Sequence, residues 1–127
     1  MRNGLYGLAI AGAFSVVWLA PAAAANEAAI SSHCQNEWPG DAEMLDHCSN
    51  EQRQALRNLG KYSGEIRERC GGEWGVDYVM VLHCVKERTS AKNNIEQNFS
   101  GPVRKACERE WGTEYEMVEH CIEENGE

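Results

Sequence analysis

The residues best suited to chemistry in this chain are cysteines and histidines that recur at a fixed spacing. Two cysteines stand fourteen positions apart in each of three units, and the units repeat after 36 and then 37 residues. The cysteine pairs are Cys34 with Cys48, Cys70 with Cys84, and Cys107 with Cys121, and the histidines directly before the second cysteines are His47, His83 and His120. Such thiols and imidazoles can form disulfide bonds, or they can bind a transition metal such as copper or zinc.

The spacing favours disulfide bonds within each unit. If a unit is a helical hairpin, its second cysteine lies about two turns into the second helix and can face the first cysteine across the hairpin. A bond that closes such a short loop stabilises the fold by about 3 kcal/mol in the chain-entropy model. Cysteine-bound metal is the alternative use of the same thiols.

A metal site built from the histidines is the second alternative, because a methionine stands three residues before each of them: Met44, Met80 and Met117. The spacing does not favour a metal site. Neighbouring residues on a helix point about 100° apart, so an adjacent histidine and cysteine do not easily bind one ion, and no Cys-x2-Cys pair is present. We therefore expect no cofactor and methionines packed in the core. We expect the histidines to be partly exposed, or to bond the glutamate beside the recurring tryptophan.

Further positions of the unit recur and predict its fold. After the first cysteine come a Glu-Trp pair and an acid: Glu37-Trp38 and Asp41, Glu73-Trp74 and Asp77, and Glu110-Trp111 and Glu114. An apolar residue four before each first cysteine shares a helical face with it. The sequence therefore predicts an all-α fold of three disulfide-closed hairpins in one small domain, with units at about residues 26–61, 62–98 and 99–127.

Local signals refine this expectation. The segments Ser63-Gly64 and Ser100-Gly101-Pro102 are expected to start two of the helices, and Thr113 with Glu116 is expected to form a capping box. We expect each tryptophan to plug the open end of its hairpin. The polar residues 51–54 and 86–88 are expected to form solvated helix faces.

Composition and charge limit the classes of protein to consider. The chain has 127 residues, 20 acidic and 12 basic side chains, and a net charge of −8. Large aliphatic residues are scarce, which with this much charge is typical of disorder unless crosslinks replace the missing core. An acidic balance of this size makes a nucleic-acid partner unexpected.

The N-terminal residues 1–25 have the pattern of a secretory signal peptide. A basic Arg2 is followed by an uncharged run from Leu5 to Leu19 and by a small-residue cleavage region that ends at Ala25. We expect a periplasmic or secreted protein with no membrane span after cleavage. An uncleaved membrane anchor is the alternative, because the uncharged stretch is about long enough to cross a bilayer.

The pattern Cys-x3-Trp-Gly-x-Asp-Tyr-x-Met-x3-Cys, clearest from Cys70 to Cys84, resembles motifs of small exported or membrane-anchored bacterial proteins of uncharacterised function. The resemblance implies a bacterial envelope setting and a helical hairpin. It implies no activity, substrate or site.

The function expected from the sequence is a non-enzymatic binding or structural role in the cell envelope. No catalytic motif is present, and repetition multiplies a surface without creating one reactive centre. Tyr78 and Tyr115, at matching positions, are the expected binding residues, and the acidic surface predicts a basic protein partner. The alternative is a periplasmic protein that handles copper or zinc through His47, His83 and His120.

Overall fold

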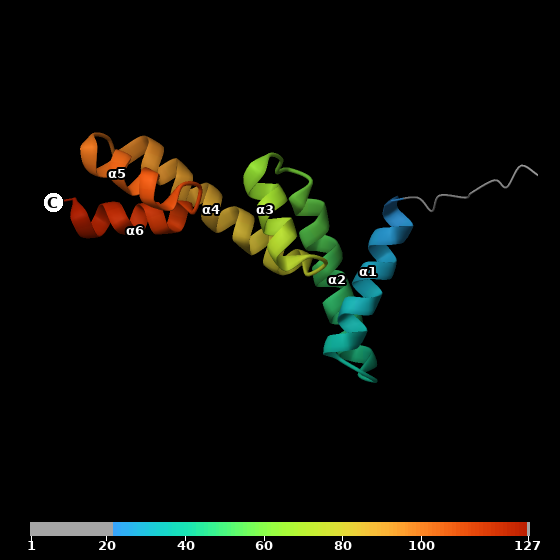
Figure 1. The fold of residues 1–127 in the computed structure, drawn as a ribbon. Helices are drawn as coiled ribbons and strands as arrows, with labels where there is room; N and C mark the ends of the chain where they lie inside the picture. The colour runs from blue at the N-terminus through green and yellow to red at the C-terminus, as the bar shows by residue number, and fades with distance from the viewer. Residues whose placement is uncertain (1–21, 127) are drawn as a thin grey trace, which may run out of the picture.

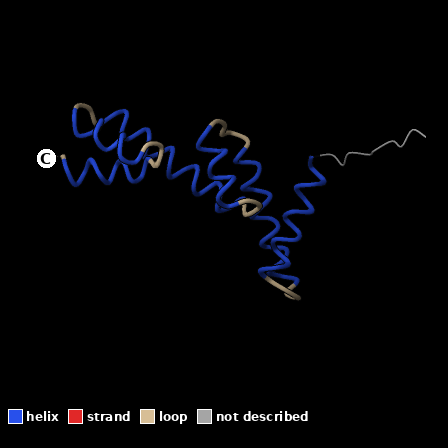
Figure 2. The backbone as a smooth tube through the Cα atoms, viewed as in Figure 1, coloured by secondary structure: helices blue, strands red, loops and turns tan. Residues whose placement is uncertain are grey.

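The structure is a computed structural model that describes residues 22–126, all of whose regular elements are α-helices (Figures 1 and 2). The helices are α1 (Ala22–Glu37), α2 (Ala42–Leu59), α3 (Glu65–Trp74), α4 (Tyr78–Asn98), α5 (Pro102–Trp111) and α6 (Tyr115–Asn125). They form three consecutive hairpins, which confirms the predicted all-α fold. The predicted signal peptide lies outside the described residues except for residues 22–25, which belong to α1.

A disulfide bond crosses each hairpin, and all six cysteines pair within their own unit. The bonds join Cys34 to Cys48, Cys70 to Cys84, and Cys107 to Cys121, with a Cα–Cα distance of 5.8 Å in each. This distance is typical of disulfide bonds in proteins. The hairpin geometry therefore confirms the pairing predicted from the fourteen-residue spacing.

Recurring acids begin two of the second helices. The Asp41 carboxylate accepts a hydrogen bond of 3.1 Å from the backbone N–H of Met44, and that of Asp77 accepts one of 3.2 Å from Met80. Each bond satisfies a free N–H of the first helical turn. In the first two units, the acid three residues before the methionine therefore caps the second helix through its side chain.

Two of the predicted helix starts are confirmed, at Ser63-Gly64 and Ser100-Gly101-Pro102, and the one at Thr113 is wrong by one residue. Glycines occupy the positions before α3 and α5, Gly64 and Gly101, where φ is 89° and no side chain caps the helix. Positive φ favours glycine over serine at these positions. The capping box expected at Thr113 does not form, because α6 begins one residue later than that box requires, after Glu114.

Three small cores, each built on one disulfide bond, replace a single central core. Buried residues of the second are Leu59, Cys70, Val81, Cys84 and Val85, and those of the third are Ile95, Cys107, Val118, Cys121 and Ile122. The first is smaller, with Ile30, Cys34 and Cys48. Each hairpin therefore depends on its crosslink for much of its interior.

The second helices connect the hairpins into a row. Figure 1 shows α4 passing from α2 at one end to α6 at the other. We call the contact between α2 and α4, together with the end of α1, the first joint. The contact of α4 with α6, together with the end of α3, is the second joint. The two joints place equivalent positions of successive units against one another.

Candidate functional site

The histidines of the predicted metal alternative are not gathered into one ligand set. His47, His83 and His120 lie on α2, α4 and α6, one in each unit, and all three are exposed. His47 and His120 each face a glutamate one helical turn on, at 3.3 Å and 3.2 Å. Their neighbours are therefore these glutamates and not the ones beside the tryptophans.

The two predicted binding tyrosines lie at the joints. Tyr78 packs against both the first and the second core, and its hydroxyl lies 3.3 Å from the Asn26 side-chain oxygen. Tyr115 packs against the third core, and the Lys92 ammonium lies 5.8 Å from its ring centre. Both rings are half-buried. Packing between units is their visible role, and partner binding by them stays a prediction.

The tryptophans contradict the expected plug role. Trp38, Trp74 and Trp111 are 40%, 44% and 37% exposed, respectively. The cores are centred on the disulfide bonds and extend away from the hairpin turns, so a residue one turn beyond the first cysteine lies outside them. Sequence periodicity gives the helical face of a residue but does not show where along the helix the core ends.

Other apolar side chains are also exposed, and they stand close to the turns in sequence: Val76, Val79 and Met117. The methionines accordingly depart from the expected core role. Met117 is 38% exposed, and Met44 and Met80 are half-buried. Each hairpin turn therefore presents a tryptophan, and the second and third turns add further apolar side chains.

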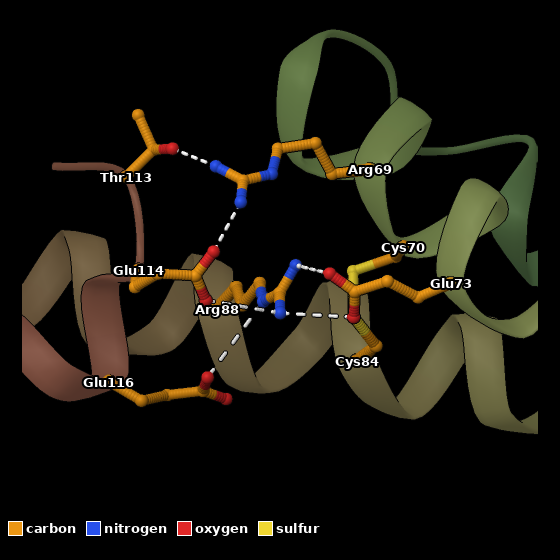
Figure 3. A network of polar contacts seen from close by, with 8 residues as sticks. All are labelled: Arg69, Cys70, Glu73, Cys84, Arg88, Thr113, Glu114 and Glu116. Carbon is orange, nitrogen blue, oxygen red and sulfur yellow. Dashed lines mark hydrogen bonds and ion pairs between the residues drawn. A yellow bond between two sulfur atoms is a disulfide. The ribbon is translucent and has the colours of Figure 1, made fainter. Parts of the chain in front are cut away.

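A buried guanidinium group organises the second joint (Figure 3). Arg88, on α4, donates two hydrogen bonds of 2.9 Å and 3.1 Å to the carboxylate of Glu73, on α3. It also lies 3.4 Å from Glu114 and 3.8 Å from Glu116, at the start of α6. Burial lowers the pKa of Arg88, but the bonds to Glu73 and the surrounding negative charges outweigh it, so the pKa lies above its usual value.

A second arginine reaches the same joint from α3. Arg69 donates to the Thr113 hydroxyl and to the carboxylate of Glu114 (Figure 3). Two guanidinium groups therefore face three carboxylates here, and charge-assisted bonds link α3, α4 and α6.

The first joint uses a neutral side chain at the position that matches Arg88. Gln52, four residues after Cys48, donates a 3.0 Å hydrogen bond to Asp77 Oδ1 and accepts one of 2.7 Å from the Tyr78 N–H. Gln52 is 4% exposed and Arg88 is 9% exposed, so the expectation of solvated faces is wrong at both residues. Their position one turn after the second cysteine, on the inward stripe, is the signal that could have identified them.

His33 occupies the first joint at the position that matches Arg69. Its Nε2 atom is buried and has no hydrogen-bond partner among the described residues. The nearest carboxylate oxygens are Glu37 Oε1 at 3.6 Å and Asp77 Oδ2 at 4.0 Å. The histidine outside the repeat, to which no recurring motif points, is thus the one with the most unusual surroundings.

A cavity of about 300 Å³ adjoins His33 at the first joint. Its lining includes acids, imidazoles, sulfur-containing side chains and the exposed Trp38 and Val79. The lining residues are His33, Glu37, Trp38, Met44, His47, Cys48, Glu51, Gln52, Asp77, Val79 and Met80. The first joint therefore combines an unpaired imidazole, free carboxylate oxygens and open space.

Comparison of the chain with protein-family models, curated proteins and solved structures finds no match. Among residues 22–126, no helix has the length and apolar character needed to cross a membrane. Three disulfide bonds in a small helical protein are typical of an oxidising compartment outside the cytoplasm. Any assignment of function rests on the chain's own residues.

Proposed function

We propose that this protein is an exported, non-enzymatic binding protein of the cell envelope that contacts a basic protein partner through its three hairpin turns. The observation that carries the proposal is the exposure of a tryptophan at the same place in every unit: Trp38, Trp74 and Trp111. Tryptophan is enriched among the residues that dominate binding energy at protein interfaces. A small fold with few large apolar residues gains little stability from leaving all three exposed.

The charge of the molecule indicates the chemistry of the partner. A glutamate precedes each of these tryptophans, and without residues 1–25 the net charge becomes −9, because Arg2 is the only charged residue lost. Acidic surfaces speed association with basic proteins, and the effect weakens as salt screens the charges. A partner with a basic patch and apolar pockets would use both features.

Repetition adds valency to this surface. Three similar sites in one row of disulfide-closed hairpins can engage a partner with repeated features, and the affinity then exceeds that of any single site. The disulfide-closed hairpins hold each tryptophan at the end of a short helix, which limits the ordering cost of binding.

The test uses a triple variant in which all three tryptophans are replaced by alanine. A matched control replaces Gln35, Gln54 and Gln97 by alanine, because these three residues are also exposed and are uncharged, two in the first unit and one in the second. A partner is captured from envelope extract with the native protein, purified, and titrated against all three forms. We expect the tryptophan variant to lose about tenfold or more in affinity and the glutamine variant to bind as the native protein does.

Salt titration completes the experiment. Binding should weaken as ionic strength rises, since the partner is expected to be basic. Equal affinity of the two triple variants, or salt-independent binding to an acidic partner, would place the contact surface elsewhere on the molecule. Circular dichroism of each variant checks that helicity is retained.

A further inference from the structure

The geometry of the first joint points to a metal-binding site, and we infer that His33, Glu37 and Asp77 bind one divalent transition-metal ion such as Zn²⁺. The inference does not depend on the proposed partner binding. It differs from a site made of the recurring histidines, because His33 has no counterpart histidine in the other units.

The distances around His33 fit a small cation better than they fit hydrogen bonds. Nε2 lies 3.6 Å from Glu37 Oε1 and 4.0 Å from Asp77 Oδ2, too far for either to accept a hydrogen bond. Ligand atoms of a tetrahedral zinc site, with bonds of about 2.0 Å, lie about 3.3 Å apart. Glu37 is exposed, so rotation of its side chain can bring its carboxylate toward His33 and Asp77.

Asp77 is held in place with one oxygen left free. Its Oδ1 atom accepts hydrogen bonds from the Gln52 amide and from the Met80 N–H. Oδ2 is the oxygen that faces His33. Hydrogen bonds of this kind orient a carboxylate and limit the ordering cost of binding a metal.

The second joint shows that a cation suits this position. There, Arg69 occupies the place of His33 and Arg88 that of Gln52, and both pair with Glu114, the counterpart of Asp77. The first joint retains the two carboxylates, Glu37 and Asp77, but has a histidine and a neutral amide instead of two guanidinium groups. A divalent ion would supply the positive charge that the arginines supply in the other joint.

The surroundings can complete the coordination. The adjoining cavity has space for a water molecule as a fourth ligand, and its lining includes His47 and the thioether side chains of Met44 and Met80. The sulfur of Cys48 also lies within 4.8 Å of the His33 and Glu37 ligand atoms, but it belongs to a disulfide bond and offers no thiolate. An imidazole with two carboxylates is a ligand set that zinc accepts.

Calorimetric titration of tag-free, chelator-treated protein with Zn²⁺ tests the inference. We expect one ion per native chain, and about a tenfold or greater loss of affinity in His33→Ala and in Asp77→Asn. Asparagine can still cap α4, so the second variant keeps the helix start. The matched control is His120→Ala, because His120 and Glu124 have the same four-residue spacing as His33 and Glu37, on an exposed face.

A third variant separates metal binding from structural damage. His33→Arg copies the second joint, so it should abolish Zn²⁺ binding while its metal-free form melts at or above the temperature of the native protein. Zn²⁺ should raise the Tm of the native protein and of His120→Ala, and leave that of His33→Arg unchanged. The inference is wrong if the native protein shows no saturable binding, or if His120→Ala loses as much affinity as His33→Ala, which would indicate weak binding at exposed histidines only.

Discussion

At the second joint the guanidinium group of Arg88 is buried against three carboxylates, whereas at the first joint the matching residue is the neutral amide of Gln52. Both residues stand four positions after the second cysteine of their unit, and both reach the acid that precedes the next second helix. The same backbone arrangement therefore accepts an ionic contact or a neutral one between hairpins.

Position in the repeat, more than residue type, decides which polar side chains are buried at the joints. Glu37 and Glu73, the glutamates beside tryptophan, both lie at a joint. Glu37 faces His33, which directly precedes the first cysteine, and Glu73 pairs with Arg88, four residues after the second cysteine. The tryptophan next to each glutamate is exposed. The Glu-Trp pair thus joins a residue that faces a side chain of its own unit at a joint to one that faces solvent.

Removal of the central disulfide bond should give the largest effect, because α4 takes part in both joints. The Cys70→Ser, Cys84→Ser double variant should lose about 3 kcal/mol from the chain-entropy effect, and more as both joints loosen. The corresponding variant of Cys107 and Cys121 affects one joint only and should lose less. Urea unfolding followed by circular dichroism measures both, and equal losses would contradict the central role of α4.

Replacement of Arg88 by glutamine, the residue at the matching position of the first joint, should give the next largest loss of stability. Arg88→Gln should lower the free energy of unfolding by about 2 kcal/mol, because it leaves carboxylates without their cation. We expect less than for a fully buried pair, since Glu73, Glu114 and Glu116 remain accessible to water.

The control for that change is Lys86→Gln, which removes one exposed positive charge from the same helix. It should change the unfolding free energy by less than about 0.5 kcal/mol. Equal losses in the two variants would mean that Arg88 acts only through the net charge of the protein. Urea unfolding at low and high salt distinguishes the local effect from the general one.

Most of the fold was predictable because its signals are local. The fourteen-residue spacing of Cys70 and Cys84 and the helical register of Ile66 lie within one hairpin, and the structure confirms the pairing that they indicate. The joints were not predictable in this way. Residue type does not distinguish Gln52 and Arg88 from their solvated neighbours, and their position on the inward stripe does not show which residues of the next unit they contact.

The candidate sites show the same division between local and tertiary information. The repeat predicts a buried Trp74 at the hairpin turn, whereas the side chain is exposed. Helical periodicity gives the face on which this residue lies but does not show that the core ends before the turn. His33 was missed because it breaks the repeat. A departure from repeat symmetry at a position filled by arginine in the next unit was the available signal.

Loss of the amide at the first joint should have a smaller effect than loss of the guanidinium at the second. Gln52→Ala should lower the free energy of unfolding by about 1 kcal/mol, because it removes two hydrogen bonds and leaves the backbone N–H of Tyr78 without its partner. Gln54→Ala, on the exposed face of the same helix, is the control and should be close to neutral. Urea unfolding checks this order, and a loss larger than that of Arg88→Gln would reverse the ranking of the two joints.

Loss of the exposed ion pair between Arg53 and Glu27 should change the free energy of unfolding least. This pair has bidentate geometry without burial, so it tests the two features separately. Arg53 donates hydrogen bonds of 2.9 Å from Nε and Nη2 to the Glu27 carboxylate, linking α2 to α1. The hydrogen bond from Arg53 lowers the pKa of Glu27 below its usual value, partial burial opposes this, and the arginine charge adds to it. Because the folded-state pKa is the lower one, the contribution is present above the unfolded value and is lost as pH falls through the folded one.

We therefore expect Arg53→Gln to return the pKa of Glu27 to its ordinary range in a carboxyl NMR titration. At neutral pH the same variant should change the unfolding free energy less than Gln52→Ala does, because solvent screens an exposed pair. Arg57→Gln, another exposed arginine of α2, should leave the Glu27 titration unchanged. A stability loss as large as that of Arg88→Gln would show that bidentate geometry alone, without burial, makes an arginine pair important in this fold.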